Sequence, residues 1–346
     1  MNLNERKLQI LQAIVSDFIR SAEPIGSRTL SRKYGMGISP ATIRNEMADL
    51  EEMGFLTHPY TSAGRVPSTK AYRLYVDALM ERYELTKDER SQIRKQLNLK
   101  TLELDRTMEH AAKILSELTS LTSFAMTPSQ QEDFLKYVNI ISVDADTVVL
   151  VMVSESGKVS NTTLKIKVPY KEEQLELLAK VMTYNYKGRK LTDILTMDII
   201  RNFESDMEAM SKLAESIMPR FMNTLENMLD TELHLDGLMN IFAIPEYNDI
   251  EKAKLFLEMV NKKDFTDILI NRDNGVIITI GDENTEEIMR DCSLITATYA
   301  IDGKPVGKLG VIGPIRMEYN HVTSVIEYMT EHLNDAFLTG GEEDEE

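Results

Sequence analysis

The chain has 346 residues and carries 56 Asp or Glu against 39 Lys or Arg, a formal net charge of −17. With 42% hydrophobic and 27% charged residues, it has the composition of a folded protein long enough for two or three domains. No apolar run approaches the roughly 20 residues that a membrane helix needs, and the start lacks a signal-peptide pattern. We therefore predict a cytoplasmic protein without a membrane partner.

The residues that usually carry catalysis or bind metals form no motif. The single cysteine, Cys292, rules out an intrachain disulfide and a cysteine zinc site, and the five histidines are scattered without metal-ligand spacing. There is no phosphate-binding glycine loop and no nucleophile–base pair. We expect no catalytic residue, no metal and no cofactor, so an enzyme with an accessory DNA-binding segment has no support.

The charge is distributed unevenly along the chain. Residues 1–73 contain ten Lys or Arg and seven Asp or Glu, a net charge of +3, so the remaining residues carry −20. A mildly basic segment on an acidic body is typical of a protein that binds DNA through one end. Many segments without a nucleic-acid partner have the same balance, so the charge alone does not decide between the two.

The N-terminal segment predicts three helices, over residues 4–21, 27–34 and 39–53. Ser39 is a good N-cap for the third helix, and Pro40 stands at its first position, where the missing N–H costs nothing. A helix, a short helix, a tight turn and a capped helix form the pattern of a helix-turn-helix. A three-helix bundle without a ligand has the same local pattern.

The third predicted helix has two different faces. Ile43, Met47 and Leu50 recur at helical spacing and should face a core. The opposite face carries small residues that allow close approach, together with Arg and Asn, which read guanine and adenine edges in the major groove. A helix N-terminus also suits a phosphate. We predict that five residues of this face contact DNA: Ser39, Ala41, Thr42, Arg44 and Asn45.

Residues 54–68 predict two short extended pieces around a Ser-Ala-Gly tip, which is the pattern of the wing in a winged helix. Arg65 follows the tip glycine, where it could enter a minor groove or meet phosphates; alone, it would be an ordinary solvated loop arginine. A helix resumes after Ser68. Phosphate contacts are predicted for four more side chains: Arg28, His58, Lys70 and Arg73.

The body of the chain predicts an α+β domain in two parts. A long amphipathic helix over 101–126 precedes three strands between 134 and 168 that are joined by short turns, as in an antiparallel meander. Three more strands between 275 and 313 precede a final helix over 318–337. The stretch between these two parts, roughly 170–272, is rich in helices.

Three segments resemble the HrcA family of bacterial heat-inducible transcription repressors. They are EPIGSRTLSRKYGMGISPATIRNEMADLEEMGFLTHPYTSAGRVPSTKAYRLYVD, HLDGLMNIFAIPEYND and DCSLITATYAIDGKPVGKLGVIGPIRMEYNHVTSVIEYM. The resemblance implies a GAF-like fold with a dimerising domain inserted into it. It also implies a repressor that binds an inverted repeat upstream of chaperone operons, is kept active by the chaperonin and fails on heating.

One helix of the middle stretch carries methionine and other apolar residues at 3–4 spacing. Such a stripe is either an internal core or a dimer interface, because methionine fills irregular cores and is also common at binding surfaces. The resemblance favours the interface. The predicted dimerisation residues are Met207, Met210, Leu213, Ile217 and Phe221.

The predicted fold class is therefore multidomain α+β. The predicted domains are a winged helix-turn-helix over 1–80, a helical linker over 81–102, a GAF-like domain over 103–169 and 273–338, an inserted dimerisation domain over 170–272 and a disordered acidic tail over 339–346. The predicted function is a homodimeric repressor of heat-shock operons, with double-stranded DNA and the chaperonin as partners. The alternative is a ligand-responsive transcription regulator that senses a small molecule through its GAF-like domain.

Overall fold

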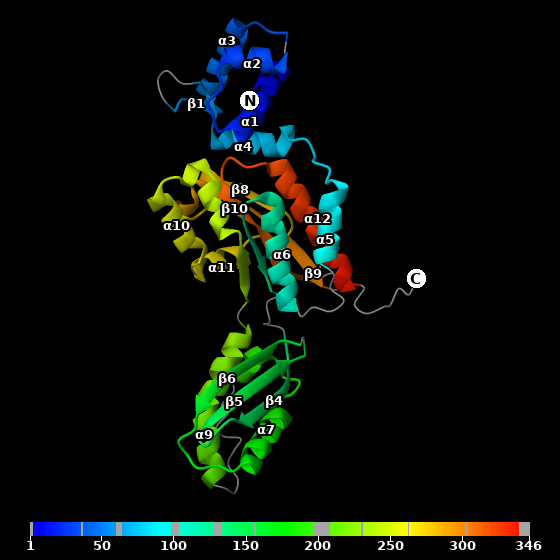
Figure 1. Ribbon diagram of the computed structural model, residues 1–346, viewed down its shortest axis with the longest axis vertical. Helices are drawn as coiled ribbons and strands as arrows, with labels where there is room; N and C mark the ends of the chain where they lie inside the picture. The colour runs from blue at the N-terminus through cyan, green and yellow to red at the C-terminus, as the bar shows by residue number, and fades with distance from the viewer. Residues whose placement is uncertain are drawn as a thin grey trace, which may run out of the picture. The chain divides into compact units, whose positions relative to one another are not determined.

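The computed structural model forms two compact units, Met1–Thr127 with Leu233–Glu346, and Pro128–Glu232 (Figure 1). Both units combine helices with antiparallel strands, which confirms the α+β multidomain class. The second unit is inserted into the first, because the chain leaves the first unit after Thr127 and re-enters it at Leu233. The structure describes residues 3–35, 37–59, 64–97, 104–127, 133–155, 157–196, 208–229, 231–261, 263–301 and 304–338.

The first unit begins with an N-terminal module of helices and one short hairpin. Its elements are α1 (Glu5–Ser21), α2 (Ser27–Tyr34), α3 (Pro40–Glu52), β1 (Leu56–Thr57), β2 (Val66–Pro67), α4 (Thr69–Leu74) and the π-helical turn η1 (Tyr75–Leu79). The Asn4 side chain caps α1, and Ala22 ends it in the left-handed conformation with φ 56°. Ile10, Leu30 and Ile43 are fully buried, so the three helices share one core.

The predicted linker contains a packed helix, α5 (Lys87–Gln96). A capping box between Thr86 and Glu89 starts this helix, and the buried Ile93 joins the core of the first unit. Arg94 donates a hydrogen bond of 2.8 Å to the hydroxyl of Tyr328 on the C-terminal helix. The segment is thus part of the folded unit, because its one apolar stripe has a neighbour to cover it.

The remainder of the first unit is an α/β domain built on a five-stranded antiparallel sheet in the order β7-β3-β10-β9-β8. Its strands are β3 (Thr122–Met126), β7 (Leu233–Asp236), β8 (Ile277–Ile280), β9 (Cys292–Ile301) and β10 (Lys304–Pro314). Its helices are α6 (Leu104–Thr119), α10 (Ile250–Val260), α11 (Lys263–Ile270) and α12 (Tyr319–Leu338), with the short 3-10 turns η3 (Leu238–Ala243), η4 (Pro245–Tyr247), η5 (Gly281–Glu283) and η6 (Glu287–Met289).

Helices cover both faces of this sheet (Figure 1). Ala125 and Ile295 pack with α6 and α12, whereas their strand neighbours Phe124 and Leu294 pack with α10 and α11. Successive residues of a strand point to opposite faces, so a strand between two helical layers is apolar on both sides. The core on the α6 and α12 face continues into the N-terminal module.

The helix predicted over 101–126 is too long, and the structure corrects it. The described part of α6 ends at Thr119, Ser120 takes the left-handed conformation with φ 55°, and residues 122–126 form β3, an inner strand of the sheet. All five residues of β3 are buried. A strand buried on both faces shows no alternation of apolar and polar residues, so its sequence resembles a continuation of the helix.

Gly310→Ala is expected to destabilise the first unit. A Cβ at Gly310 in β10 would overlap the carbonyl oxygen of Ile295 in β9 and lie 2.8 Å from the ring of Phe124. Overpacking of this kind costs about 1–2 kcal/mol, so the thermal midpoint should fall by several degrees. The matched control is Gly26→Ala, because a Cβ at Gly26 meets nothing within 4 Å and its φ is −99°. Equal melting of both variants and the parent would contradict the close approach of the two strands.

The inserted unit is a three-stranded sheet covered by helices. Its elements are β4 (Leu135–Ser142), β5 (Thr147–Ser154), β6 (Val159–Lys165), α7 (Glu172–Tyr186), α8 (Leu191–Thr196) and α9 (Glu208–Leu229). The strands pair in the order β4-β5-β6, so the predicted meander is confirmed. The boundaries differ from the prediction: the meander belongs to the inserted unit, and residues 233–272 belong to the first unit.

The apolar stripe of α9 lies in the core of the inserted unit. Leu213 is 1% exposed, Ile217 and Phe221 are fully buried, and the ring of Phe221 lies 5.6 Å from that of Tyr186 in α7. These three side chains contact their own chain, so the prediction that they form the surface of a dimer needs correction. Met207 lies outside the described residues, and Met210 lies outside the described side chains.

The opposite face of this small sheet is exposed. Tyr137 and Ile141 in β4 are each 47% exposed, and Val159 in β6 is 58% exposed. The strand register places all three on one face, with Val153 of β5 between Tyr137 and Val159. An apolar sheet face left open to solvent is typical of a surface that contacts another molecule.

Candidate nucleic-acid interface

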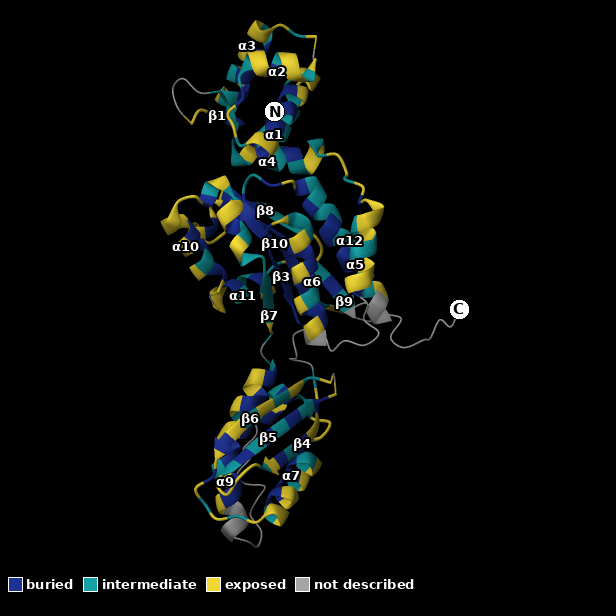
Figure 2. Ribbon diagram, viewed as in Figure 1, coloured by how far each residue is buried: buried dark blue, intermediate teal, exposed yellow. Residues whose placement is uncertain are grey.

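The exposed face of α3 carries the five residues predicted to contact DNA. Ser39, Ala41, Arg44 and Asn45 are exposed and Thr42 is half-buried. Figure 2 shows exposed residues along α2 and α3 at the outer side of the N-terminal module. The Ser39 hydroxyl accepts a hydrogen bond of 3.1 Å from the backbone N–H of Thr42, so the first turn of α3 is capped.

The buried face of α3 is held by charged residues of α1. Glu46 is 9% exposed and accepts hydrogen bonds from Lys7 (2.6 Å) and Arg6 (3.4 Å). Lys7 also forms an ion pair of 2.8 Å with Asp49, and the hydrogen bonds that its ammonium donates to Asp49 and Glu46 raise the pKa of Lys7. Sequence patterning missed Glu46, because a glutamate on a core-facing stripe is recognisable only when its partners are known.

Two of the predicted cations have no carboxylate within ion-pairing distance in the described part of the chain. Arg44 projects from α3 and Arg28 from the first turn of α2, and both are exposed. Three acidic residues of α3, by contrast, have basic partners on α1 or the hairpin: Glu46, Asp49 and Glu51. The exposed side of α2 and α3 therefore offers cations and helix N-termini to an anion.

Arg65 directly precedes β2, and its backbone and side chain both have partners within the chain. Its backbone pairs with that of Ile25 through hydrogen bonds of 2.9 and 3.1 Å. Its guanidinium forms an ion pair of 2.7 Å with Glu51 and a hydrogen bond of 3.2 Å with the Nδ1 atom of His58. The Nε2 atom of His58 lies 3.3 Å from Glu51. The carboxylate of Glu51 thus binds both hairpin residues that were predicted to contact DNA, His58 and Arg65.

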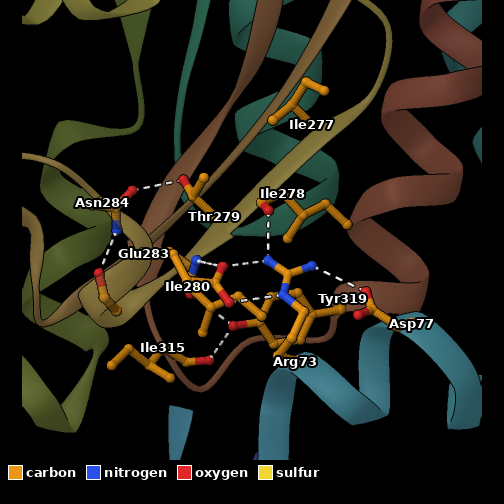
Figure 3. Close-up of polar contacts among 12 residues, drawn as sticks. Arg73, Asp77, Ile277, Ile278, Thr279, Ile280, Glu283, Asn284, Ile315 and Tyr319 are labelled. Atoms are coloured by element: carbon orange, nitrogen blue, oxygen red, sulfur yellow. Dashed lines mark hydrogen bonds and ion pairs between the residues drawn. The ribbon is translucent and has the colours of Figure 1, made fainter. Parts of the chain in front are cut away.

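Lys70 and Arg73 also have partners within the chain. Lys70 donates a hydrogen bond of 2.8 Å to the carbonyl oxygen of Met53 at the end of α3 and lies over the ring of Phe55. Arg73 points to the α/β domain, where it binds Glu283 and the carbonyl oxygen of Ile278 (Figure 3). Its guanidinium therefore faces that domain, and no local sequence pattern indicates this distant partner.

Two further observations concern other kinds of site. Among the residues that the structure describes, no three His, Cys, Asp or Glu side chains are arranged to hold a metal ion. None of the described helices is both long enough and apolar enough to span a bilayer.

These features define a mixed α+β protein whose small basic module exposes one capped helix. Comparison with known proteins identifies the family. Residues 105–323 match the family model described as HrcA protein C terminal domain. The chain is 41% identical over 337 residues to the heat-inducible transcription repressor HrcA of Alkaliphilus metalliredigens, covering 97% of this chain and 98% of the relative. The chain belongs to the HrcA family.

A second relative agrees with this assignment, and one solved structure matches the fold. The HrcA repressor of Clostridium acetobutylicum is 38% identical over 335 residues, which cover 96% of this chain and 97% of the relative. A solved structure described as the crystal structure of a hypothetical protein at 2.2 Å resolution has a TM-score of 0.69 and 22% identity. That match covers 98% of this chain and 100% of the other, so the two share an overall fold.

Proposed function

We propose that this protein is a DNA-binding repressor of heat-shock operons and that its N-terminal module is a winged helix-turn-helix. The observation that carries the proposal is the exposed face of α3, where Arg44 and Asn45 are exposed on a capped helix whose opposite side is bound to α1. The relatives are named heat-inducible transcription repressors, which supports heat-shock operons as the proposed target genes.

In this proposal α3 enters the major groove with its N-terminal turns. Thr42, Arg44 and Asn45 meet base edges, while Ala41 leaves room for close approach. The first turn of α2 lies against the backbone, where Arg28 meets a phosphate. Ser39 caps the reading helix at the point where its N-terminus faces the phosphates.

We further propose that the protein acts as a homodimer, because an inverted repeat presents two half-sites to a two-fold symmetric protein. The open sheet face of the inserted unit supports this, since Tyr137, Ile141 and Val159 are apolar and exposed. The α/β domain is proposed to be GAF-like. The family resemblance adds the chaperonin as a partner, a cytoplasmic location and loss of repression on heating, through a dimer of marginal stability.

A second candidate function is a regulator that also responds to a small molecule. A cavity of about 870 Å³ lies between the N-terminal module and the α/β domain, with Phe18, Tyr72, Tyr247 and Phe256 among its lining residues. Its size is in the range of ligand sites in proteins. Since one wall belongs to the DNA-binding module, a bound molecule would influence that module directly.

The repressor proposal is tested by fluorescence anisotropy with a chaperone-operon inverted repeat and a scrambled duplex. We expect tight, salt-sensitive binding to the repeat at growth temperature and loss of binding after warming. Equal, weak binding to both duplexes under all conditions would count against an inverted-repeat operator.

Glu51→Gln is expected to strengthen binding to every duplex by about three- to tenfold, because it frees Arg65 to meet a phosphate. The plot of the logarithm of affinity against the logarithm of salt concentration should become steeper by about one. The matched control is Glu52→Gln, which removes the same charge from the neighbouring exposed residue. An equal gain in both variants would show that net charge, and not Arg65, is responsible.

A further inference from the structure

Arg73 in α4 and Glu283 in η5 join the N-terminal module to the α/β domain (Figure 3). We propose that this pair is an orientation latch that fixes the direction in which the module presents α3 for operator binding. Arg73 and Glu283 are thus positioning residues, and Arg73 is not a phosphate contact. The inference rests on the proposed DNA-binding function.

The latch is a two-pronged contact. The Nε atom of Arg73 donates a hydrogen bond of 2.8 Å to one carboxylate oxygen of Glu283, and its Nη2 atom binds the other oxygen. The same Nη2 atom donates a hydrogen bond of 2.6 Å to the carbonyl oxygen of Ile278. The two side chains are 30% and 32% exposed. A planar guanidinium that binds both oxygens of a partly buried carboxylate fixes the relative orientation of the two side chains as well as their separation.

The carboxylate of Glu283 is held in place by its own turn. It accepts a hydrogen bond of 2.9 Å from the backbone N–H of Ile280. The neighbouring Asn284, 7% exposed, donates 3.0 Å hydrogen bonds to the carbonyl oxygens of Gly281, Met289 and Cys292. Partial burial opposes ionisation of Glu283, but the hydrogen bonds from Arg73 and Ile280 outweigh it and lower the pKa. The acceptor is therefore rigid and charged.

A second polar contact crosses between the module and the α/β domain at a different point. Arg316 donates a hydrogen bond of 2.7 Å to the carbonyl oxygen of Ile19 at the end of α1 and is held by Glu246 at 2.6 and 3.0 Å. The module also shares a hydrophobic core with the domain, which keeps the two attached. Apolar packing has little directional preference, whereas the two hydrogen-bonded contacts, on α1 and on α4, fix the orientation of the module. Breaking the latch therefore loosens that orientation without detaching the module.

Loss of the latch has a consequence specific to a two-site operator. A dimer must place two reading helices at a fixed separation on successive major-groove faces, about 34 Å or a multiple of it. A module that pivots still fits a single half-site, because that site sets no separation. The latch therefore acts on the complete inverted repeat and not on the half-site.

The test compares Arg73→Gln, Glu283→Gln and the double variant on a complete inverted repeat, a single half-site and repeats with altered spacers. We expect each single variant to bind the complete repeat about tenfold more weakly and the half-site as the parent does. The double variant should be no weaker than the singles, because one contact is lost in all three. The affinity of each variant should depend less on the length of the spacer between half-sites than the affinity of the parent does. The control is Asp77→Asn, which removes the partner that Arg73 has within the module at 3.1 Å.

Two outcomes would overturn the latch. If Arg73→Gln weakens every duplex equally with a salt slope lower by about one, and Glu283→Gln does not weaken binding, then Arg73 is a phosphate contact. If both variants weaken the half-site as much as the repeat and also melt earlier, the pair has only a structural role.

Failure of the proposed function gives a different result, in which the parent protein does not distinguish the repeat from a scrambled duplex. The latch is then judged without DNA, by amide hydrogen exchange over residues 69–79 and 277–284. Faster exchange in both single variants, but not in Asp77→Asn, supports a latch between module and domain. Unchanged exchange in both overturns it.

Discussion

Arg44→Ala is expected to reduce operator affinity by about 1–3 kcal/mol, roughly 5- to 150-fold, and to relax the base preference at one position of each half-site. Arg44 is exposed on α3, on the face opposite Ile43, Met47 and Leu50, and no carboxylate of the described residues neutralises it. Anisotropy titrations with the operator, its single-base variants and a scrambled duplex measure both effects.

Two arginines provide controls for this prediction. Arg28→Ala should weaken binding to all duplexes alike and lower the salt slope by about one, because a phosphate contact carries no sequence information. Arg82→Ala should leave binding unchanged, since Arg82 is 84% exposed and pairs loosely with Glu327 of α12. An Arg44→Ala protein that binds the operator like the parent would show that a different face of α3 meets the DNA.

The faces of α3 could be predicted from the sequence because they depend on local rules. The spacing of Ile43, Met47 and Leu50 sets the buried side, and Ser39 with Pro40 sets the start. These rules need no knowledge of distant residues. Four of the residues predicted to face outward are exposed and Thr42 is half-buried, and the contacts of all five with DNA stay a prediction.

The partners of the other cations could not be predicted in this way. Arg73 and Glu283 lie 210 positions apart in the chain, and Arg65 meets Glu51 only after the hairpin folds back on α3. A sequence pattern shows that such a cation is near the surface, but not whether a carboxylate already binds it. This is why Arg65, Lys70 and Arg73 have partners within the chain that the sequence did not indicate, while their contacts with DNA stay a prediction.

The predicted domain boundaries differ from those of the structure for a related reason. β3 and β7 pair side by side although the whole inserted unit separates them in sequence, and β7 is only four residues long. The meander of β4, β5 and β6 follows from its turns, but a meander has the same local signature in either domain. Only long-range pairing assigns the strands to their sheets.

Phe221→Ala is expected to lower the free energy of unfolding of the inserted unit by about 3–5 kcal/mol. Phe221 is fully buried, packs against Tyr186 and belongs to a core formed only by residues of this unit. Truncation leaves a cavity that the helices α7 and α9 cannot close without moving. Chemical denaturation should show an early transition for the inserted unit and an unchanged transition for the first unit.

The same variant separates a core residue from a dimer contact. Loss of a core ring lowers stability at every protein concentration, whereas loss of a dimer contact leaves folded monomers and an effect that fades as concentration rises. The control is Tyr184→Ala, which truncates a side chain of α7 that is 88% exposed and should not change unfolding. If Phe221→Ala instead gave folded monomers, the stripe on α9 would have to be open to a partner in solution. Dissociation of the proposed dimer on warming would then begin at the α9 stripe, and not at the open face of the sheet.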